Sequence, residues 1–316
     1  MAVRARPAAN FGSKAAEATS ERRDKGRSIR PLGSILPLMR AIILSVMLSA
    51  SAWGQTKTIF LITDAEGVGG VCRQEQTDPK DAEMRQLLTG EINAAVEGFL
   101  AGGADEVLVW DGHDGSMTLS TLTIHPKAKL LMGALGASML MERKFAAVAY
   151  VGQHSKGNVQ RGVMAHSYSS LGIQNMKLNG KPVGEIDVIA AMAGHFGTPA
   201  IFLSGDKAAA DELHEIVPDA EVAVVKEGLA RYACISLSAE AARALIREGA
   251  RRSVAKIGKV KPYVVRGPVT IEVEYTTRNS LPPDAGLRTG ATVIDDRTIR
   301  FVGKDILEAW QRYRTR

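Results

Sequence analysis

Residues 57–70, KTIFLITDAEGVGG, decide the fold and carry the first chemical signal in the chain. The apolar run is rich in β-branched residues, which is typical of a buried strand, and it ends in acidic residues followed by glycines. Side chains alternate along a strand, so Asp64 and Glu66 lie on the same side of its carboxyl end. Buried carboxylates are costly without a cation, so this pair favours a cation site. The alternative is a pair of solvated acidic residues in a loop.

Two of the six histidines repeat this context. The strand-like run 106–110 precedes a glycine-rich turn that carries His113, and the run 146–151 precedes His154. The carboxyl ends of parallel strands meet at one edge of a sheet, where open α/β folds bind their ligands. If the three runs are neighbours in one parallel sheet, the acidic pair and both histidines converge there. Mixed oxygen and nitrogen ligands suit zinc or a similar divalent ion.

The net charge of +6 belongs to the N-terminal segment. Residues 1–54 hold nine Lys and Arg against three Asp and Glu, whereas the remainder of the chain holds 31 of each. The remainder is therefore neutral and provides no argument for binding nucleic acid. We expect no nucleic-acid partner.

Residues 1–54 have the order of a leader with a secretory signal peptide. Arg40 precedes an apolar region at about 41–52, which ends in small residues. This region is too short for a transmembrane helix, so we expect no stable membrane span after the signal is removed. The protein is then exported, to the periplasm or the medium, with translation starting at Met1 or Met39. The alternative is an uncleaved leader that anchors the chain to a membrane.

Strand-like and helix-like patterns alternate over residues 55–260, which predicts an α/β catalytic domain with a mostly parallel sheet covered by helices. Alternating strands at 269–275 and 298–302 and a closing helix at 305–313 predict a smaller α+β C-terminal subdomain over residues 261–316. The elements predicted for the first domain are strands at 57–63, 106–110, 128–132, 146–151 and 199–203, helices at 81–100, 184–194, 207–216 and 239–256, and a hairpin at 178–183.

Two further residues are candidates for chemistry. Glu185 opens a helix, where it either complements the helix dipole or joins the metal candidates. His166 is a candidate for proton transfer near the metal, or a partly buried structural histidine. Cys72 and Cys234 are the only cysteines, and no CxxC motif is present, which argues against a thiolate-rich zinc site. Export would allow the two cysteines to pair.

Five motifs, in this order along the chain, carry the candidate residues: DAEG (64–67), DGH (111–113), GQH (152–154), GVMAHS (162–167) and NGKPVGE (179–185). This set resembles the M55 metallopeptidases, which are zinc-dependent D-aminopeptidases. The resemblance extends from about Thr58 to the C-terminus and includes the segments PVTIEVEY and TGATV of the small subdomain. Five ordered motifs make the resemblance specific, although no single one of them would.

The resemblance implies a site with two zinc ions per subunit. In the family pattern, the residue that matches Asp64 bridges the two ions. Residues matching Glu66 and His113 complete the ligands of one ion. Residues matching His154 and Glu185 complete those of the other.

The resemblance also implies the activity. His166 matches the active-site histidine of the family, which is proposed as nucleophile or general acid–base. An aminopeptidase acting on short peptides with an N-terminal D-residue such as D-Ala is implied, as is a homo-oligomer, because family members assemble into rings. The segment 155–161 and the export signal depart from the family pattern and leave the substrate open. The alternatives are a dinuclear metallohydrolase for another amide, an L-peptide or a phosphoester, and a non-catalytic metal- or solute-binding envelope protein.

Overall fold

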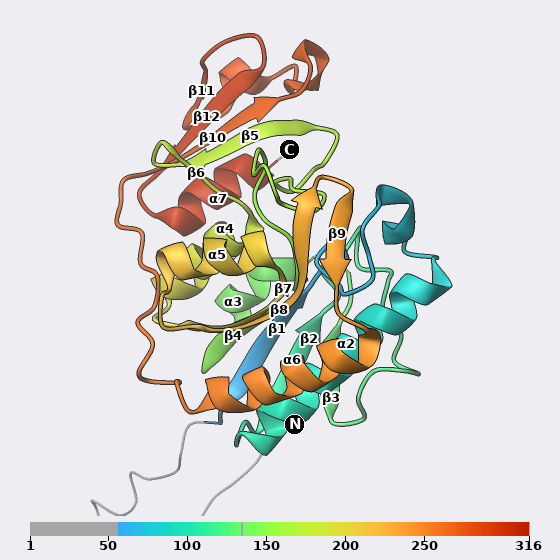
Figure 1. Cartoon of the computed structure of the whole chain (residues 1–316). Helices are drawn as coiled ribbons and strands as arrows, with labels where there is room; N and C mark the ends of the chain where they lie inside the picture. Colours follow the sequence, from blue (N-terminus) through green and yellow to red (C-terminus); the bar gives the residue numbers. More distant parts are fainter. Residues whose placement is uncertain (1–55, 134, 316) are drawn as a thin grey trace, which may run out of the picture. The chain divides into compact units, whose positions relative to one another are not determined.

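In the computed structural model, which describes residues 56–133 and 135–315, seven strands form the main sheet in the order β3-β2-β1-β4-β7-β8-β9 (Figure 1). The strands are β1 (Thr58–Thr63), β2 (Glu106–Trp110), β3 (Ala128–Leu131), β4 (Ala147–Gln153), β7 (Ala200–Asp206), β8 (Glu221–Ala230) and β9 (Ala233–Ser236). All neighbours pair in parallel except β8 and β9. The mostly parallel sheet is thus confirmed. The expected leader, residues 1–54, lies outside the described residues.

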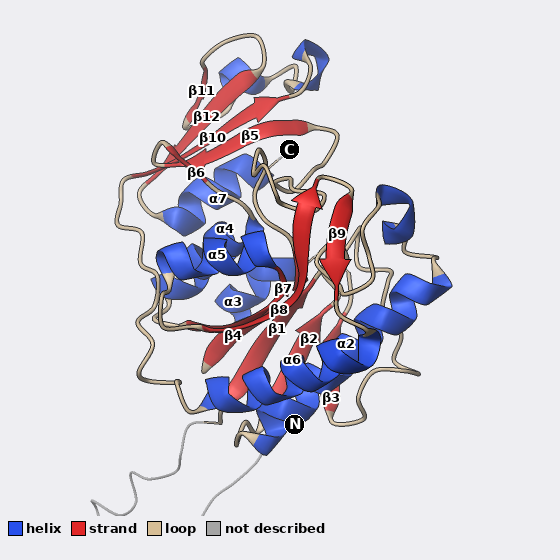
Figure 2. Ribbon diagram, viewed as in Figure 1, coloured by secondary structure: helices blue, strands red, loops and turns tan. Residues whose placement is uncertain are grey.

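Helices cover both faces of this sheet (Figure 2). The alternation of side chains along β1 sends Ile59 and Leu61 into one core, which they share with α2 (Ala82–Ala101) and α6 (Ala239–Val254). Phe60 and Ile62 enter the opposite core. The helices that contribute to the opposite core are α3 (Met139–Glu142), α4 (Glu185–His195), α5 (Lys207–Ile216) and α7 (Ile306–Arg314). None of the helices in the described part of the chain is long and apolar enough to cross a membrane.

A second sheet is antiparallel and has the order β11-β12-β10-β5-β6. Its strands are β5 (Ile173–Leu178), β6 (Lys181–Pro182), β10 (Val269–Tyr275), β11 (Ala291–Val293) and β12 (Thr298–Gly303). The expected hairpin joins β5 to β6, and Asn179 and Gly180 have φ of 50° and 80° at its turn, as a type I′ turn requires. The small sheet therefore recruits a hairpin from the middle of the chain. The division of the chain at residue 260 stays a prediction.

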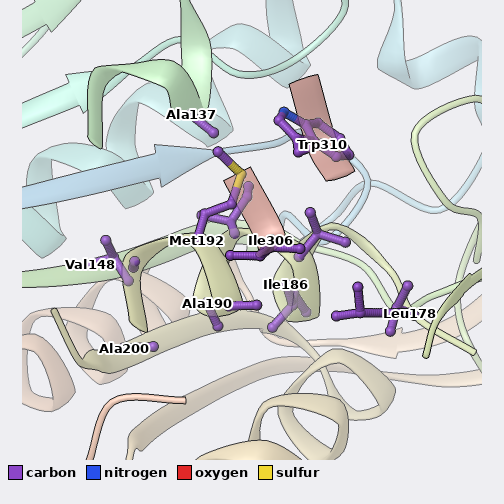
Figure 3. Close-up of a cluster of buried hydrophobic side chains, with 14 of the residues drawn as sticks. Ala137, Val148, Leu178, Ile186, Ala190, Met192, Ala200, Ile306 and Trp310 are labelled. Carbon is purple, nitrogen blue, oxygen red and sulfur yellow. The ribbon is translucent and has the colours of Figure 1, made fainter. Parts of the chain in front are cut away.

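One hydrophobic cluster connects the two sheets through α4 and α7. Leu178 of β5, Ile186 of α4 and Ile306 of α7 belong to the same cluster as Val148 of β4 (Figure 3). Ile186 lies beside Glu185, at the first turn of α4. The packing of the second sheet therefore fixes the end of α4 that carries a predicted metal ligand.

No strand is predicted from the sequence between residues 217 and 238, where the structure has β8 and β9. Lys226, Glu227 and Gly228 interrupt the apolar pattern of β8, and the end of this strand is exposed. The first half of β8, EVAVV, has the β-branched composition of a strand, and pairing with β7 extends the strand through the polar residues that follow. The strand β9 carries Cys234, whose free thiol is hydrogen-bonded to that of Cys72.

Two buried charges hold the loop that follows β1. Lys226 is 2% exposed, and its Nζ donates to three backbone carbonyls of residues 66–71. Glu91 of α2 is also buried and accepts the N–H of Gly69 at 2.8 Å. Burial raises the pKa of Glu91 to about 7, although Gly69 and Lys226 oppose the rise. Lys226 thus fixes the loop through its backbone carbonyls, and Glu91 fixes it through the backbone N–H of Gly69.

We expect Glu91→Gln to become more stable relative to the wild type as the pH rises. The pKa of Glu91 is about 7 in the folded state and near 4.5 in the unfolded state. Between these values the unfolded chain has already lost the proton that the folded chain keeps, so the wild type loses stability as the pH rises. The cost is about 3 kcal/mol, since each unit of pKa corresponds to about 1.4 kcal/mol. Urea denaturation of both proteins at pH 5 and pH 8 measures the difference.

Glu83→Gln is the matched control, because Glu83 lies on the same helix and is exposed. The free energy of unfolding of this control relative to the wild type should change little with pH. An equally small change for Glu91→Gln would contradict a buried carboxyl group that is protonated at low pH.

Candidate metal centre

The predicted site lies where the strand order of the main sheet reverses. Strands β2 and β3 follow β1 on one side, and β4, β7, β8 and β9 follow on the other. In open α/β sheets, the crevice at the carboxyl ends of the strands at such a point binds ligands. Asp64 directly follows β1, His154 directly follows β4, and His113 lies in the turn after β2. The topology therefore brings these three side chains to one crevice.

Glycines let the strand ends approach each other. The N–H of Gly67 donates to the carbonyl of Gly152 at 2.8 Å. Gly152 has φ of +76°, and a Cβ on it would lie 2.0 Å from the carbonyl oxygen of Asp64. A larger residue at this position would push apart the two strand ends that carry Asp64 and His154. This explains the glycine at the first position of the GQH motif, residues 152–154.

Asp64 lies between two histidines. Its Oδ1 is 3.0 Å from Nδ1 of His113, and its Oδ2 is 3.3 Å from Nε2 of His154. Glu66 Oε2 is 3.3 Å from the same nitrogen of His113. Glu185 Oε1, at the start of α4, is 3.6 Å from Nε2 of His154. The structure thus brings all five predicted ligand residues together, and four of them are buried.

These side chains form two groups that are able to hold a metal ion, and His166 belongs to one of them. Within each group, one ligand atom from every residue lies within 4.8 Å of the others. Asp64 connects the groups, since one of its oxygens faces each. The groups are Asp64, Glu66 and His113, and His154, His166 and Glu185.

Backbone carbonyls orient the three histidines. Each ring has one nitrogen within hydrogen-bond distance of a carbonyl, and when the ring is neutral, donation of its N–H there leaves the other nitrogen with a free lone pair. The free atoms are then Nδ1 of His113 and Nε2 of His154 and His166. The contacts are His113 Nε2 to Thr77 at 2.7 Å, His154 Nδ1 to Ser155 at 2.9 Å, and His166 Nδ1 to Met164 at 2.8 Å.

Two buried polar atoms of the site have no hydrogen-bond partner among the described residues. They are Oε2 of Glu66 and Nε2 of His154. Buried polar atoms nearly always have a partner, so each such atom needs an explanation. A carboxylate oxygen and an imidazole nitrogen are both ligands of divalent zinc. The residues present therefore fit a divalent metal.

The histidines compensate the buried negative charge in the protein itself. Burial alone would raise the pKa of Asp64, but the neighbouring rings of His113 and His154 lower it well below its usual value. Burial likewise opposes protonation of His113, yet Asp64 and Glu66 raise its pKa to about 11. Burial raises the pKa of Glu185 to about 7, and the charge of His154 opposes this. Three carboxylates thus share two imidazolium groups.

The pKa of His166 is lowered, whereas those of His113 and His154 are raised. Burial and the charge of His154 lower the pKa of His166 to about 3, so its imidazole is neutral at pH 7. Its ring stacks on that of His154 with centroids 4.0 Å apart and an interplanar angle of 14°. The neutral ring presents a lone pair on Nε2 that can accept a proton or a metal ion.

An open cleft of about 860 Å³ leads to the centre. It is lined by residues of both groups, and Met117 and Leu171 line it with side chains that are 72% and 87% exposed. Glu75, Asp78 and Asp114 add negative charge to its walls. The cleft is large enough for a short peptide and favours one that carries a positive charge.

The site also depends on residues that the motifs do not predict. Thr77 orients His113 through its backbone carbonyl, which any residue could supply, so the sequence holds no signal for it. Lys226 and Glu91 have a signal, because each is a charged residue within an otherwise apolar pattern of a strand or a helix. Such interruptions indicate buried partners when the surrounding positions belong to a core.

Comparison with known proteins agrees with this geometry. The model of the M55 peptidase family, described as D-aminopeptidase, matches residues 58–315. A D-aminopeptidase of Bacillus subtilis (strain 168) is 29% identical over 264 residues, which cover 80% of this chain and 94% of the relative. The solved structure of the "Zn-dependent D-aminopeptidase DppA from Bacillus subtilis, a self-compartmentalizing protease" matches with a TM-score of 0.75 at 28% identity, covering 81% of this chain and 95% of that chain. The chain is a peptide hydrolase and belongs to the M55 family of D-aminopeptidases.

Proposed function

We propose that this chain is a dinuclear zinc aminopeptidase that removes an N-terminal D-amino acid, such as D-Ala, from short peptides. The observation that carries the proposal is the position of Asp64, whose two carboxylate oxygens face two separate groups of ligands. The zinc dependence and D-aminopeptidase activity named for the Bacillus subtilis relative support the metal and the substrate class.

The contacts support the ligand set. Asp64, Glu66 and His113 would hold one ion. Asp64, His154 and Glu185 would hold the other. Bound zinc would act as a Lewis acid on the scissile carbonyl group.

His166 moves the proton in this proposal. Its N–H at Nδ1 is held by the carbonyl of Met164, so Nε2 is the atom that exchanges protons. The ring would accept a proton from the attacking water and then donate it to the leaving amine. The His166 ring stacks on that of His154, and one of its nitrogens lies within 4.8 Å of a ligand atom of each other residue in its group.

The charge of the cleft supports an amine-terminated substrate. The acidic residues Glu75, Asp78 and Asp114 line the cleft in addition to the proposed ligands. Lys80 also lines it and adds one positive charge against these three negative charges. A protonated α-amine is attracted to such walls, whereas a phosphoester dianion is repelled. An aminopeptidase is therefore favoured over a phosphoesterase.

The location and assembly are also part of the proposal. The signal-like leader at residues 1–54 supports export to the periplasm or the medium, where short peptides with D-residues are the substrates. The description of the relative as a self-compartmentalizing protease supports a homo-oligomer.

Peptide hydrolysis tests the proposed activity directly. We expect the zinc-loaded protein to hydrolyse D-Ala-D-Ala, to lose this turnover with a chelator, and to regain it when zinc is restored. The substrate panel contains L-Ala-L-Ala and a chromogenic phosphoester as matched alternatives. Faster turnover of either alternative contradicts D-aminopeptidase activity, and no turnover at all favours a binding protein.

Zinc binding to metal-free protein should be coupled to proton release. The raised pKa values of His113 and His154 mean that both rings hold a second proton at pH 7, which the ions must displace. The affinity therefore rises with pH, about tenfold per pH unit for each proton released. Isothermal titration at pH 6, 7 and 8 measures this, with an expected stoichiometry of two ions per chain.

The control variant for the titration is His195→Ala, which changes an exposed histidine at the end of α4. It should bind zinc like the wild type. A stoichiometry of one, or an affinity that is independent of pH, would count against the dinuclear site.

The variant His166→Ala separates proton transfer from metal binding. We expect it to keep both zinc ions and to lose at least 100-fold in kcat, which is the range of general acid–base catalysis. Metal analysis and steady-state kinetics of the same preparation provide both values. Loss of one zinc ion would instead identify His166 as a ligand, and full activity would remove it from the mechanism.

A further inference from the structure

A second cavity, of about 330 Å³, adjoins the metal centre and is more enclosed than the open cleft. We call it the side pocket. It shares Gly112, Asp114, Tyr168 and Glu185 with the lining of the cleft. Since Glu185 is a proposed metal ligand, the side pocket opens directly beside the site of reaction.

Apolar and aromatic side chains form one part of the wall of the side pocket, and polar groups form the larger part. The wall comes from the ends of β1 and β2, from α4 and α7, and from the turn of helix at Gly136–Ser138. Ala137 and Trp310, both labelled in Figure 3, belong to the hydrophobic cluster that joins the two sheets. The apolar side chains that line the pocket are Ile62, Trp110, Leu135, Ala137, Ile189 and Trp310.

Acceptor groups line the same pocket. Asp114 lies in a strained turn, with φ of 35° at Asp114 and 64° at Ser116. Gln153 is 1% exposed, and its Oε1 has no hydrogen-bond partner among the residues that the structure describes. An acidic group and an unpaired carbonyl oxygen suit a protonated amine. Arg314 also lines the pocket, and because Asp114 and Arg314 are both exposed, water screens both charges.

We propose that the side pocket binds the N-terminal residue of the substrate and that it prefers a bulky apolar or aromatic D-amino acid over D-Ala. This inference rests on the proposed aminopeptidase function and specifies its substrate class. Asp114 and Gln153 receive the α-amine, and the apolar walls receive the side chain.

The shapes of the two cavities favour this orientation. An aminopeptidase needs space for a single residue on one side of the scissile bond and space for the rest of the peptide on the other. The enclosed side pocket meets the first requirement, and the open cleft meets the second. A volume of about 330 Å³ is at the small end of ligand pockets and far exceeds a methyl group. D-Ala would leave most of the apolar wall in contact with water.

Kinetics on D-aminoacyl p-nitroanilides test the preference. We expect kcat/KM of the zinc-loaded wild type to be at least 10-fold higher for D-Leu than for D-Ala, because each added methylene in an apolar pocket contributes about 10-fold or more. D-Phe should also exceed D-Ala. A ratio of D-Leu to D-Ala below 10 overturns the inference.

Filling the pocket tests whether it is the cause. Ala137→Leu adds bulk to its wall, and Ser138→Leu does so from a partly exposed position, so one filler is available if the other does not fold. Each should lower the ratio of D-Leu to D-Ala at least 10-fold. The matched control, Ala101→Leu, makes the same change at an exposed residue of α2 and should keep the wild-type ratio. Melting temperatures identify the folded variants.

The outcomes separate this inference from the proposed function. Chelator-sensitive hydrolysis of D-Ala p-nitroanilide without a preference for D-Leu leaves the aminopeptidase in place and overturns the pocket assignment. A preference for D-Leu that both folded fillers retain also overturns it. Absence of chelator-sensitive turnover on every D-substrate defeats the proposed function and the inference with it.

Discussion

The compensation of buried negative charge at the carboxyl edge of the sheet is the constraint on which the structure depends. Asp64, Glu66 and Glu185 meet in a space with little access to water, and carboxylates in such a space need positive charge nearby. In the protein alone, His113 and His154 supply it as imidazolium groups, as the raised pKa of each shows. Divalent ions would supply it more strongly and would release those protons. The same interaction thus connects the stability of the fold to metal binding.

Much of the surrounding structure fixes the positions of these charged side chains. Lys226 and Glu91 fix the loop after β1 through its backbone, and backbone carbonyls orient the histidine rings. The second sheet packs on α4 and α7 and so positions the start of α4, where Glu185 lies. The small sheet is therefore part of the construction of the site, although none of its strands carries one of the proposed ligands.

Residues differ in how far the sequence predicts their place. Asp64, His113 and His154 follow strands, and the rules of strand order and chain direction in α/β folds bring such positions together. Glu185 and His166 are candidates from the sequence alone, but only the resemblance assigns their roles, because their positions depend on the packing of α4 and of the long loop between β4 and β5. That packing involves the second sheet, and the local patterns do not show that the hairpin of β5 and β6 belongs to this sheet. The charge of Lys226 within an apolar strand pattern indicates a buried partner, but only the structure identifies the backbone carbonyls that it contacts.

The division between centre and side pocket separates the chemistry from the choice of substrate. The proposed ligands lie at strand ends and at the start of α4, where close contacts such as that of Gly152 with the Asp64 backbone leave little freedom. The side pocket takes part of its wall from Gly136–Ser138 and from α7, which carry none of the proposed ligands. A change of side chain on these elements alters the space for a substrate without replacing a metal ligand. The fold can therefore keep one hydrolytic centre while the residue that it accepts varies.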